Sequence, residues 1–274
     1  MNTLKLIGAL SAVVVGIGFV SVSHAQVETP KPDVIYVPTP QPVVDAMLKM
    51  AKVKPDEMVY DLGCGDGRAV ISAARDFRAR GIGVDIDPER IQESKANAAN
   101  AGVTDRVEFK QEDLFKMNFA DADVVFLYLL PALNVRLRPR ILDELRPGTR
   151  IVSHSFSMAE WEPDENAEVN GRDILFWVVP AKVEGEWKLT LPGGEQGTLS
   201  LTQKFQKVEG VLKTKGASLP LKDAQLKGPT LTFKFGNGAD TSIATVEITG
   251  KRLNGTVQRG SSNQPATLTG ELSQ

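Results

Sequence analysis

The sequence is poor in the side chains that most often carry metal-binding and nucleophilic chemistry. Its 274 residues include one cysteine, Cys64, and two histidines, His24 and His154. A single cysteine excludes an intrachain disulfide, and one cysteine with two histidines is too few for a zinc cluster. We therefore expect no metal. His154, inside the apolar stretch RIVSHSF, is interpreted as a hydrogen-bonded structural residue.

A strong excess of one charge is also missing. Lys and Arg number 32 against 34 Asp and Glu, for a formal net charge of −2. A balance this close to neutral gives no electrostatic reason to expect nucleic acid or an anionic membrane as a partner. The 42% of hydrophobic residues excludes a disordered chain.

The first 25 residues are predicted to be a secretory signal peptide. Lys5 precedes an apolar run over residues 6–22, and Ser23-His24-Ala25 offers small residues at both key positions of a cleavage site. The run stands at the short limit of a membrane span, so an uncleaved N-terminal membrane anchor is the alternative. Either way we expect export to the periplasm or cell envelope.

Three regions follow this segment. Residues 26–42 hold five prolines and predict an extended, Pro-rich lead-in. Residues 43–181 alternate apolar strands with helical stretches, which predicts a Rossmann-like, doubly wound α/β sheet. Residues 182–274 show only short alternating segments between turns such as Gly236-Asn237-Gly238 and Asn254-Gly255. This pattern predicts a small antiparallel β domain, a meander or barrel.

Within the α/β region, apolar periodicity and Pro/Gly breaks set the expected elements. Pro88 suits the first turn of a helix, where its missing N–H costs nothing. Helices are predicted over 43–51, 69–80, 88–101 and 133–145, and strands over 58–62, 81–87, 107–110, 122–130, 150–155 and 174–179.

The stretch VYDLGCGDGR joins the first predicted strand to a helix and contains Gly63, Gly65 and Gly67. A helix starting there presents free N–H groups, and glycines let a ligand approach the backbone closely. In the dinucleotide pattern G-x-G-x-x-G the third glycine would fall on Arg68. Asp61, at the strand end, instead suits a ligand with an ammonium group, such as the methionine part of S-adenosylmethionine.

Two further carboxylates follow the next two predicted strands. Asp85 ends the second strand, where it can accept both ribose hydroxyls, and Asp113 follows the third, near an adenine amine. Taken singly, Asp85 is a candidate helix N-cap and Asp113 a surface turn residue. Because the carboxyl ends of parallel strands meet at one crevice, the two acids and the glycine turn together predict a cofactor site.

The sequence resembles the class I, seven-strand S-adenosylmethionine-dependent methyltransferases over roughly residues 36–179. DLGCGDGR is the specific motif, supported by GVDIDP and QEDLF. YVPTP, LYLLP, LRPGTRIVSHSF and WEPD narrow the resemblance to a bacterial branch related to the mitochondrial protein-lysine methyltransferases that act on the c-subunit of ATP synthase and on the adenine nucleotide translocase. The resemblance implies S-adenosylmethionine as cofactor, bound by Asp61, Gly63, Gly65 and Gly67 at the methionine part, Asp85 at the ribose, Asp113 with Leu114 at the adenine, and Ile86.

The same resemblance implies a protein lysine as methyl acceptor, on a membrane or envelope protein. Tyr128-Leu129-Leu130-Pro131 stands where base-methylating relatives often carry Asn-Pro-Pro-Tyr, so nucleic acid is not expected. Tyr128 is predicted to line the methyl-transfer channel through contact with a cationic group; a buried core tyrosine is the alternative. The segment that contains Tyr36, Pro38 and Thr39 is predicted to form a lid over the cofactor; a simple Pro-rich linker is the alternative.

A second function stays open on the sequence alone. S-adenosylmethionine is made in the cytosol, so an exported binding protein with a non-catalytic Rossmann-like domain for a nucleoside-type ligand is the alternative to a methyltransferase. A nicotinamide-dependent oxidoreductase is excluded, because the glycine spacing differs and no Tyr-x-x-x-Lys motif is present.

Overall fold

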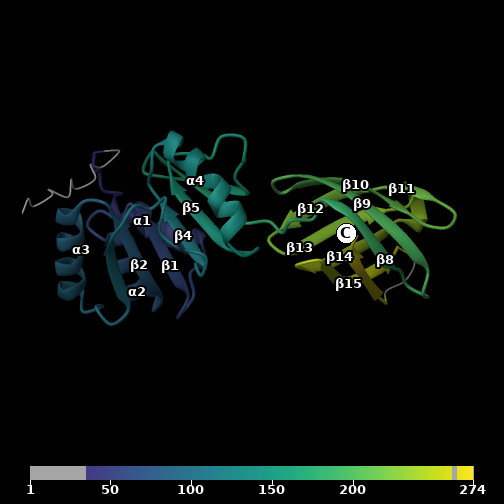
Figure 1. The fold of residues 1–274 in the computed structure, drawn as a ribbon, viewed down its shortest axis with the longest axis horizontal. Coiled ribbons are helices and arrows are strands. Elements are labelled where there is room, and N and C mark those ends of the chain that lie inside the picture. Colours follow the sequence, from purple (N-terminus) through teal and green to yellow (C-terminus); the bar gives the residue numbers. More distant parts are fainter. Residues whose placement is uncertain (1–34, 261–263, 274) are drawn as a thin grey trace, which may run out of the picture. The chain divides into compact units, whose positions relative to one another are not determined.

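The computed structural model describes residues 35–260 and 264–273. The predicted signal peptide and most of the lead-in therefore lie outside the described residues. Two β-sheets organise the described chain, one of them flanked by α-helices (Figure 1). None of the helices among these residues has the length and apolar character needed to cross a membrane.

The α/β region follows the predicted alternation of strands and helices. Its α3 matches the predicted range, with the Asp87 carboxylate accepting from the Glu89 N–H at 2.8 Å as the N-cap. The elements are α1 (Gln41–Met50), β1 (Met58–Leu62), α2 (Arg68–Phe77), β2 (Arg80–Asp85), α3 (Pro88–Ala101), β3 (Val107–Gln111), β4 (Val124–Leu127), α4 (Pro131–Glu144), β5 (Arg150–His154), β6 (Glu165–Val169) and β7 (Arg172–Val178).

These strands form one seven-stranded sheet in the order β3-β2-β1-β4-β5-β7-β6, in which β3 to β5 are parallel and β7 and β6 antiparallel. Val59 and Phe126 face a cluster with α1, α2 and α3, whereas Leu62 and Leu127 face a cluster with α4. Helices on both faces confirm the predicted Rossmann-like sheet. The strand order reverses between β1 and β4, and ligands bind at such a switch point, beyond the carboxyl ends of the strands.

Several boundaries in this region differ from the prediction by a few residues, and one strand was missed. Helix α1 begins at Gln41, inside the predicted lead-in, because Pro42 is tolerated in the first turn of a helix. Strand β4 ends at Leu127, since Pro131 already starts α4. Strand β6 was not predicted: its sequence ENAEV is polar because this edge strand is exposed along nearly its whole length.

The second region is a nine-stranded antiparallel sheet in the order β11-β10-β9-β8-β16-β15-β14-β13-β12. The Leu221 N–H donates to the Gly210 carbonyl at 2.9 Å, which brings the two ends of the sheet together and nearly closes it. Trp187 and Phe233 are fully buried in its core. Its strands are β8 (Gly185–Thr190), β9 (Gln196–Lys204), β10 (Lys207–Lys213), β11 (Ser218–Pro220), β12 (Lys222–Lys227), β13 (Thr230–Phe235), β14 (Ser242–Thr249), β15 (Arg252–Arg259) and β16 (Ala266–Leu272).

This sheet confirms the predicted antiparallel β domain, with one error. Asn254-Gly255 was predicted as a turn but lies inside β15, paired with Glu247 and Val246 of β14. Glycine is needed at 255 because a Cβ there would lie 2.1 Å from the Thr245 carbonyl oxygen. The predicted domain boundary after residue 181 falls between β7 and β8.

Candidate active site

A cavity of about 560 Å³ opens at the carboxyl ends of the parallel strands, at the switch point of the sheet. Every strand from β1 to β4 contributes to its wall through the residues that end or follow it. The wall includes seven of the nine residues predicted from the sequence for cofactor binding or catalysis: Asp61, Gly63, Asp85, Ile86, Asp113, Leu114 and Tyr128.

The other two predicted residues, Gly65 and Gly67, are not among the residues that line the cavity. Both have positive φ, and both have packing reasons to lack a side chain. A Cβ on Gly67 would lie 2.6 Å from the Phe109 ring, and one on Gly65 would lie 2.1 Å from the Tyr36 ring. Contact of these two glycines with the cofactor stays a prediction.

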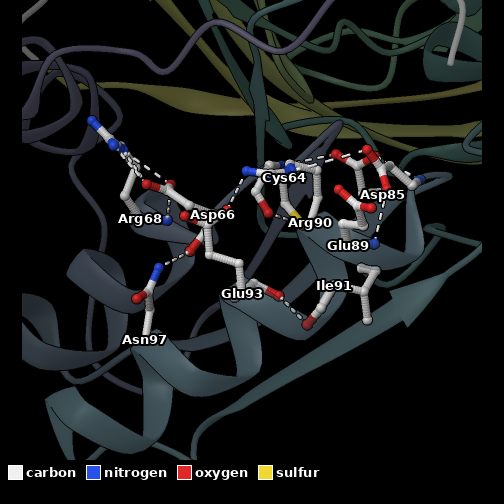
Figure 2. A network of polar contacts seen from close by, with 12 residues as sticks. Cys64, Asp66, Arg68, Asp85, Glu89, Arg90, Ile91, Glu93 and Asn97 are labelled. Carbon is white, nitrogen blue, oxygen red and sulfur yellow. Dashed lines mark hydrogen bonds and ion pairs between the residues drawn. The ribbon is translucent and has the colours of Figure 1, made fainter.

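Asp85 holds the glycine loop in place as well as facing the cavity. One carboxylate oxygen accepts from the Gly65 N–H at 2.9 Å, and the other accepts from the Asp87 N–H at 3.0 Å. Figure 2 shows a second anchor of the loop, where Asp66 pairs with Arg68 and its carbonyl accepts from the Asn97 side chain at 3.0 Å. The loop is therefore fixed by its neighbours before any ligand enters.

Asp61 is the group in the cavity that most clearly needs a ligand. It is 5% exposed, and no hydrogen bond or ion pair joins its carboxylate to the described residues. Burial, followed by the charges of Asp85 and Asp66, raises the pKa of Asp61 well above its ordinary value. A buried carboxylate without a partner is costly, and a bound cation relieves that cost. The ammonium group of S-adenosylmethionine fits this requirement.

The segment over residues 35–39 runs along the cavity and contributes five lining residues. The Tyr36 ring lies between Gly65 and the Arg90 guanidinium, whose central carbon is 4.9 Å from the ring centroid. Burial and the neighbouring Asp66 carboxylate raise the pKa of Tyr36 to about 12. Arg68 donates to the Thr39 carbonyl at 2.9 Å. These attachments favour the lid interpretation over a simple linker.

Tyr128 follows β4 and is partly exposed to the cavity, so it is not a buried core tyrosine. Its ring stacks on His154, with centroids 3.9 Å apart, and lies 5.9 Å from the Phe156 ring. The His154 Nδ1 atom is 3.1 Å from the Thr39 hydroxyl oxygen. His154 is thus hydrogen-bonded, as the sequence predicted, but its neighbours are two residues of the cavity wall.

Sequence reasoning missed several residues of the cavity wall, including Arg68, Arg90, Glu112 and Phe156. Phe156 directly follows the strand predicted over 150–155 and ends the motif LRPGTRIVSHSF, but nothing in that motif marks it as a lining residue. Arg68 and Arg90 could be identified only from the folded structure, because each contacts the segment over residues 35–39. Arg68 donates to the Thr39 carbonyl, and the Arg90 guanidinium lies over the Tyr36 ring.

The buried imidazole of His154 is expected to make the protein less stable in mild acid. Burial, with a smaller effect of the Arg172 charge, lowers the pKa of His154 from 6.5 to about 4. Between these values the unfolded chain binds a proton that the folded chain does not, so the free energy of unfolding falls as pH drops. The loss is at most about 3 kcal/mol. Thermal unfolding at pH 7 and pH 5 should show a smaller pH effect in His154→Gln; an equal effect would contradict the assignment.

Known proteins are similar to the part of the chain that contributes most of this cavity. A family model described as the ANTKMT methyltransferase domain matches residues 61–165. The protein-lysine N-methyltransferase of Saccharolobus islandicus (strain REY15A) is 48% identical over 139 residues, which are 50% of this chain and 86% of that protein. The chain belongs to this methyltransferase family.

Two further relatives agree with this assignment. The adenine nucleotide translocase lysine N-methyltransferase of Mus musculus is 31% identical over 120 residues, which cover 44% of this chain and 52% of the mouse protein. The chain thus spans about half the length of that relative. A crystal structure described as an RNA methyltransferase from Salinibacter ruber, in complex with S-adenosyl-L-homocysteine, is 49% identical with a TM-score of 0.53, covering 54% of this chain and 96% of that chain.

The predicted family resemblance is confirmed, and so is the predicted cofactor. The chain is a class I S-adenosylmethionine-dependent methyltransferase, and its matches to named enzymes disfavour a non-catalytic binding protein. The cavity at the switch point holds seven of the nine predicted site residues, and among the described residues the carboxylate of Asp61 has no hydrogen-bond or ion-pair partner there, so this cavity is the candidate cofactor site.

Proposed function

We propose that this methyltransferase acts on the side-chain amine of a lysine in a protein. The charge of the cavity carries the proposal. Its wall contains two guanidinium groups, each paired with a carboxylate, against six carboxylates in all: Asp61, Asp66, Asp85, Asp87, Glu112 and Asp113. Such a wall attracts a cationic sulfonium and an approaching lysine, and it repels the phosphates of a nucleic acid.

S-adenosylmethionine supplies a methyl group on a sulfonium: by in-line displacement the lone pair of a neutral amine forms the N–C bond as the C–S bond breaks, so that S-adenosylhomocysteine leaves and the positive charge passes to the methylated nitrogen. The chain's own part is to bind and orient. In the proposed arrangement Asp61 and Gly63 hold the methionine part, Asp85 with Ile86 holds the ribose, and Asp113 with Leu114 holds the adenine. Since such a displacement depends mostly on alignment, these contacts contribute by fixing the reacting groups in line.

Tyr128 is proposed to line the channel by which the lysine reaches the methyl group, and its replacement tests this role. An aromatic face stabilises a nearby cation by about 0.5–2 kcal/mol. Tyr128→Phe is expected to keep most of the turnover, whereas Tyr128→Ala should lower kcat by about tenfold or more without abolishing S-adenosylhomocysteine binding. Equal turnover of the wild type and the alanine variant would remove Tyr128 from the channel.

The acceptor is identified by the fate of a labelled methyl group. Full-length protein is incubated with methyl-labelled S-adenosylmethionine and cell extract, and the products are hydrolysed to amino acids and nucleosides. The proposal expects the label in N-methylated lysine. Label in methylated nucleosides would instead favour an RNA acceptor, the substrate class that the Salinibacter ruber protein's description states.

We further propose that the acceptor belongs to the membrane or envelope and that the protein is exported. Export is proposed from the apolar run over residues 6–22 and the small residues that follow it. The acceptor is proposed from the mouth of the cavity: of the five large hydrophobic side chains exposed among the described residues, four line it, namely Ile35, Tyr36, Val37 and Leu130. An apolar mouth suits a lysine flanked by apolar surface. Cell fractionation with N-terminal sequencing of the recovered protein checks export, and a cytosolic, uncut chain would contradict it.

A further inference from the structure

His154 is a costly residue for a purely structural position. It is fully buried at the end of β5, and its Nε2 atom has no hydrogen-bond partner among the described residues. A buried polar atom without a partner costs free energy that an apolar ring of similar size would not. Burial also lowers its pKa to about 4, so the ring is neutral near pH 7. The free-energy cost of burying this ring suggests that its contacts with neighbouring residues serve a function.

The side chains that hydrogen-bond to His154 and stack on it both belong to the cavity wall, although His154 itself does not line the cavity. Its Nδ1 atom lies 3.1 Å from the Thr39 hydroxyl oxygen, and its ring stacks on Tyr128 at 3.9 Å between centroids, with the planes 25° apart. Thr39 comes from the segment over residues 35–39, and Tyr128 follows β4. One ring behind the wall therefore touches two of its otherwise separate parts.

We propose that His154 is a positioning residue that couples the segment over residues 35–39 to Tyr128, so that the cover of the cofactor site and the channel wall are set together. The segment's other attachments, to Arg68 and Arg90, lie at the starts of α2 and α3, beside β1 and β2. His154 attaches it to β5, on the far side of β4 in the sheet. The segment is thus held at both sides of the switch point.

The two contacts of His154 are separable by substitution. His154→Phe keeps an aromatic ring for Tyr128 and removes the hydrogen bond, while Thr39→Val removes the same bond from the other end with little change of shape. His154→Asn keeps a hydrogen-bonding group near the Nδ1 position but removes the ring. Asp121→Ala, which removes the acceptor of the Tyr60 hydroxyl away from the cavity, is the matched control.

The test measures S-adenosylhomocysteine affinity of the full-length variants by calorimetry and amide hydrogen exchange of the 35–39 segment. The loss of one buried hydrogen bond predicts about fivefold weaker affinity for Thr39→Val and for His154→Phe. Because both remove the same bond, the double variant should also be about fivefold weaker, with faster exchange of the segment in all three. Asp121→Ala should bind as the wild type does.

Turnover is the second part of the test, and it rests on the proposed function. The affinity and exchange measurements, the binding arm of the test, do not rest on it. At saturating S-adenosylmethionine, His154→Phe should keep its kcat, and His154→Asn should lose about tenfold with affinity within twofold of the wild type. Additive losses in the double variant, or unchanged segment exchange, would overturn the coupling even if lysine methylation is confirmed. If no lysine is methylated, the binding arm still decides whether His154 holds the segment over residues 35–39.

Discussion

Replacing Asp61 by Asn is expected to weaken S-adenosylhomocysteine binding by on the order of 100-fold or more. The substitution keeps the size of the side chain but removes the charge that faces the cavity. Removing one partner of a buried charge pair costs about 3–5 kcal/mol, which is more than two decades of affinity. Calorimetric titration of the full-length variant measures the loss. Asp105→Asn, an exposed carboxylate away from the cavity, serves as the control.

The same substitution should stabilise the ligand-free protein. Because the folded-state pKa of Asp61 is raised above its ordinary value, the folded chain binds a proton more readily than the unfolded chain. The wild type therefore loses stability as pH rises through that window, and Asp61→Asn does not. Thermal unfolding at pH 5 and pH 8 measures the difference. An Asp61→Asn variant that binds S-adenosylhomocysteine as tightly as the wild type would contradict the role given to Asp61.

Replacing Gly65 by Ala is expected to weaken S-adenosylhomocysteine binding, whereas the same change at a control glycine should lower only the stability. A Cβ at 65 would lie 2.1 Å from a carbon of the Tyr36 ring, so the ring and the segment over residues 35–39 must leave their place over the loop. Gly102→Ala is the matched control, because Gly102 also has positive φ but nothing stands within 4 Å of its added Cβ. In both variants an alanine must adopt a positive φ, which lowers the free energy of unfolding by about 1 kcal/mol.

Only the Gly65→Ala variant should also lose affinity for S-adenosylhomocysteine, by about tenfold if the segment's cover contributes about 1.4 kcal/mol. Combining it with Tyr36→Ala removes the collision, so the double variant should bind no more weakly than Tyr36→Ala alone. Equal affinity of Gly65→Ala and Gly102→Ala would show that the segment does not contribute to cofactor binding.

The features that the sequence predicted are those carried by local patterns. Alternating apolar strands and helices fix the parallel sheet, and the sheet then brings Asp61, Asp85 and Asp113 to one edge although up to 52 residues separate them. Patterns of this kind need no knowledge of what lies across the fold. For that reason the gathering of these three carboxylates at one cavity was predictable from the sequence.

The features that were missed depend on contacts between distant residues. Nothing near Gly65 in the sequence indicates that the Tyr36 ring, 29 residues earlier, lies against it. The Thr39–His154 bond joins residues 115 apart, so His154 could be assigned only a generic hydrogen bond. Asn254-Gly255 has the composition of a turn, and only the neighbouring β14 shows why glycine is needed inside a strand.

The most direct test of the central claim is a calorimetric titration of the full-length protein with S-adenosylhomocysteine. The cavity at the switch point predicts one site with a dissociation constant on the order of micromolar, corresponding to about 8 kcal/mol of binding free energy. A folded protein that takes up no S-adenosylhomocysteine under these conditions would contradict the assignment of this cavity as the cofactor site.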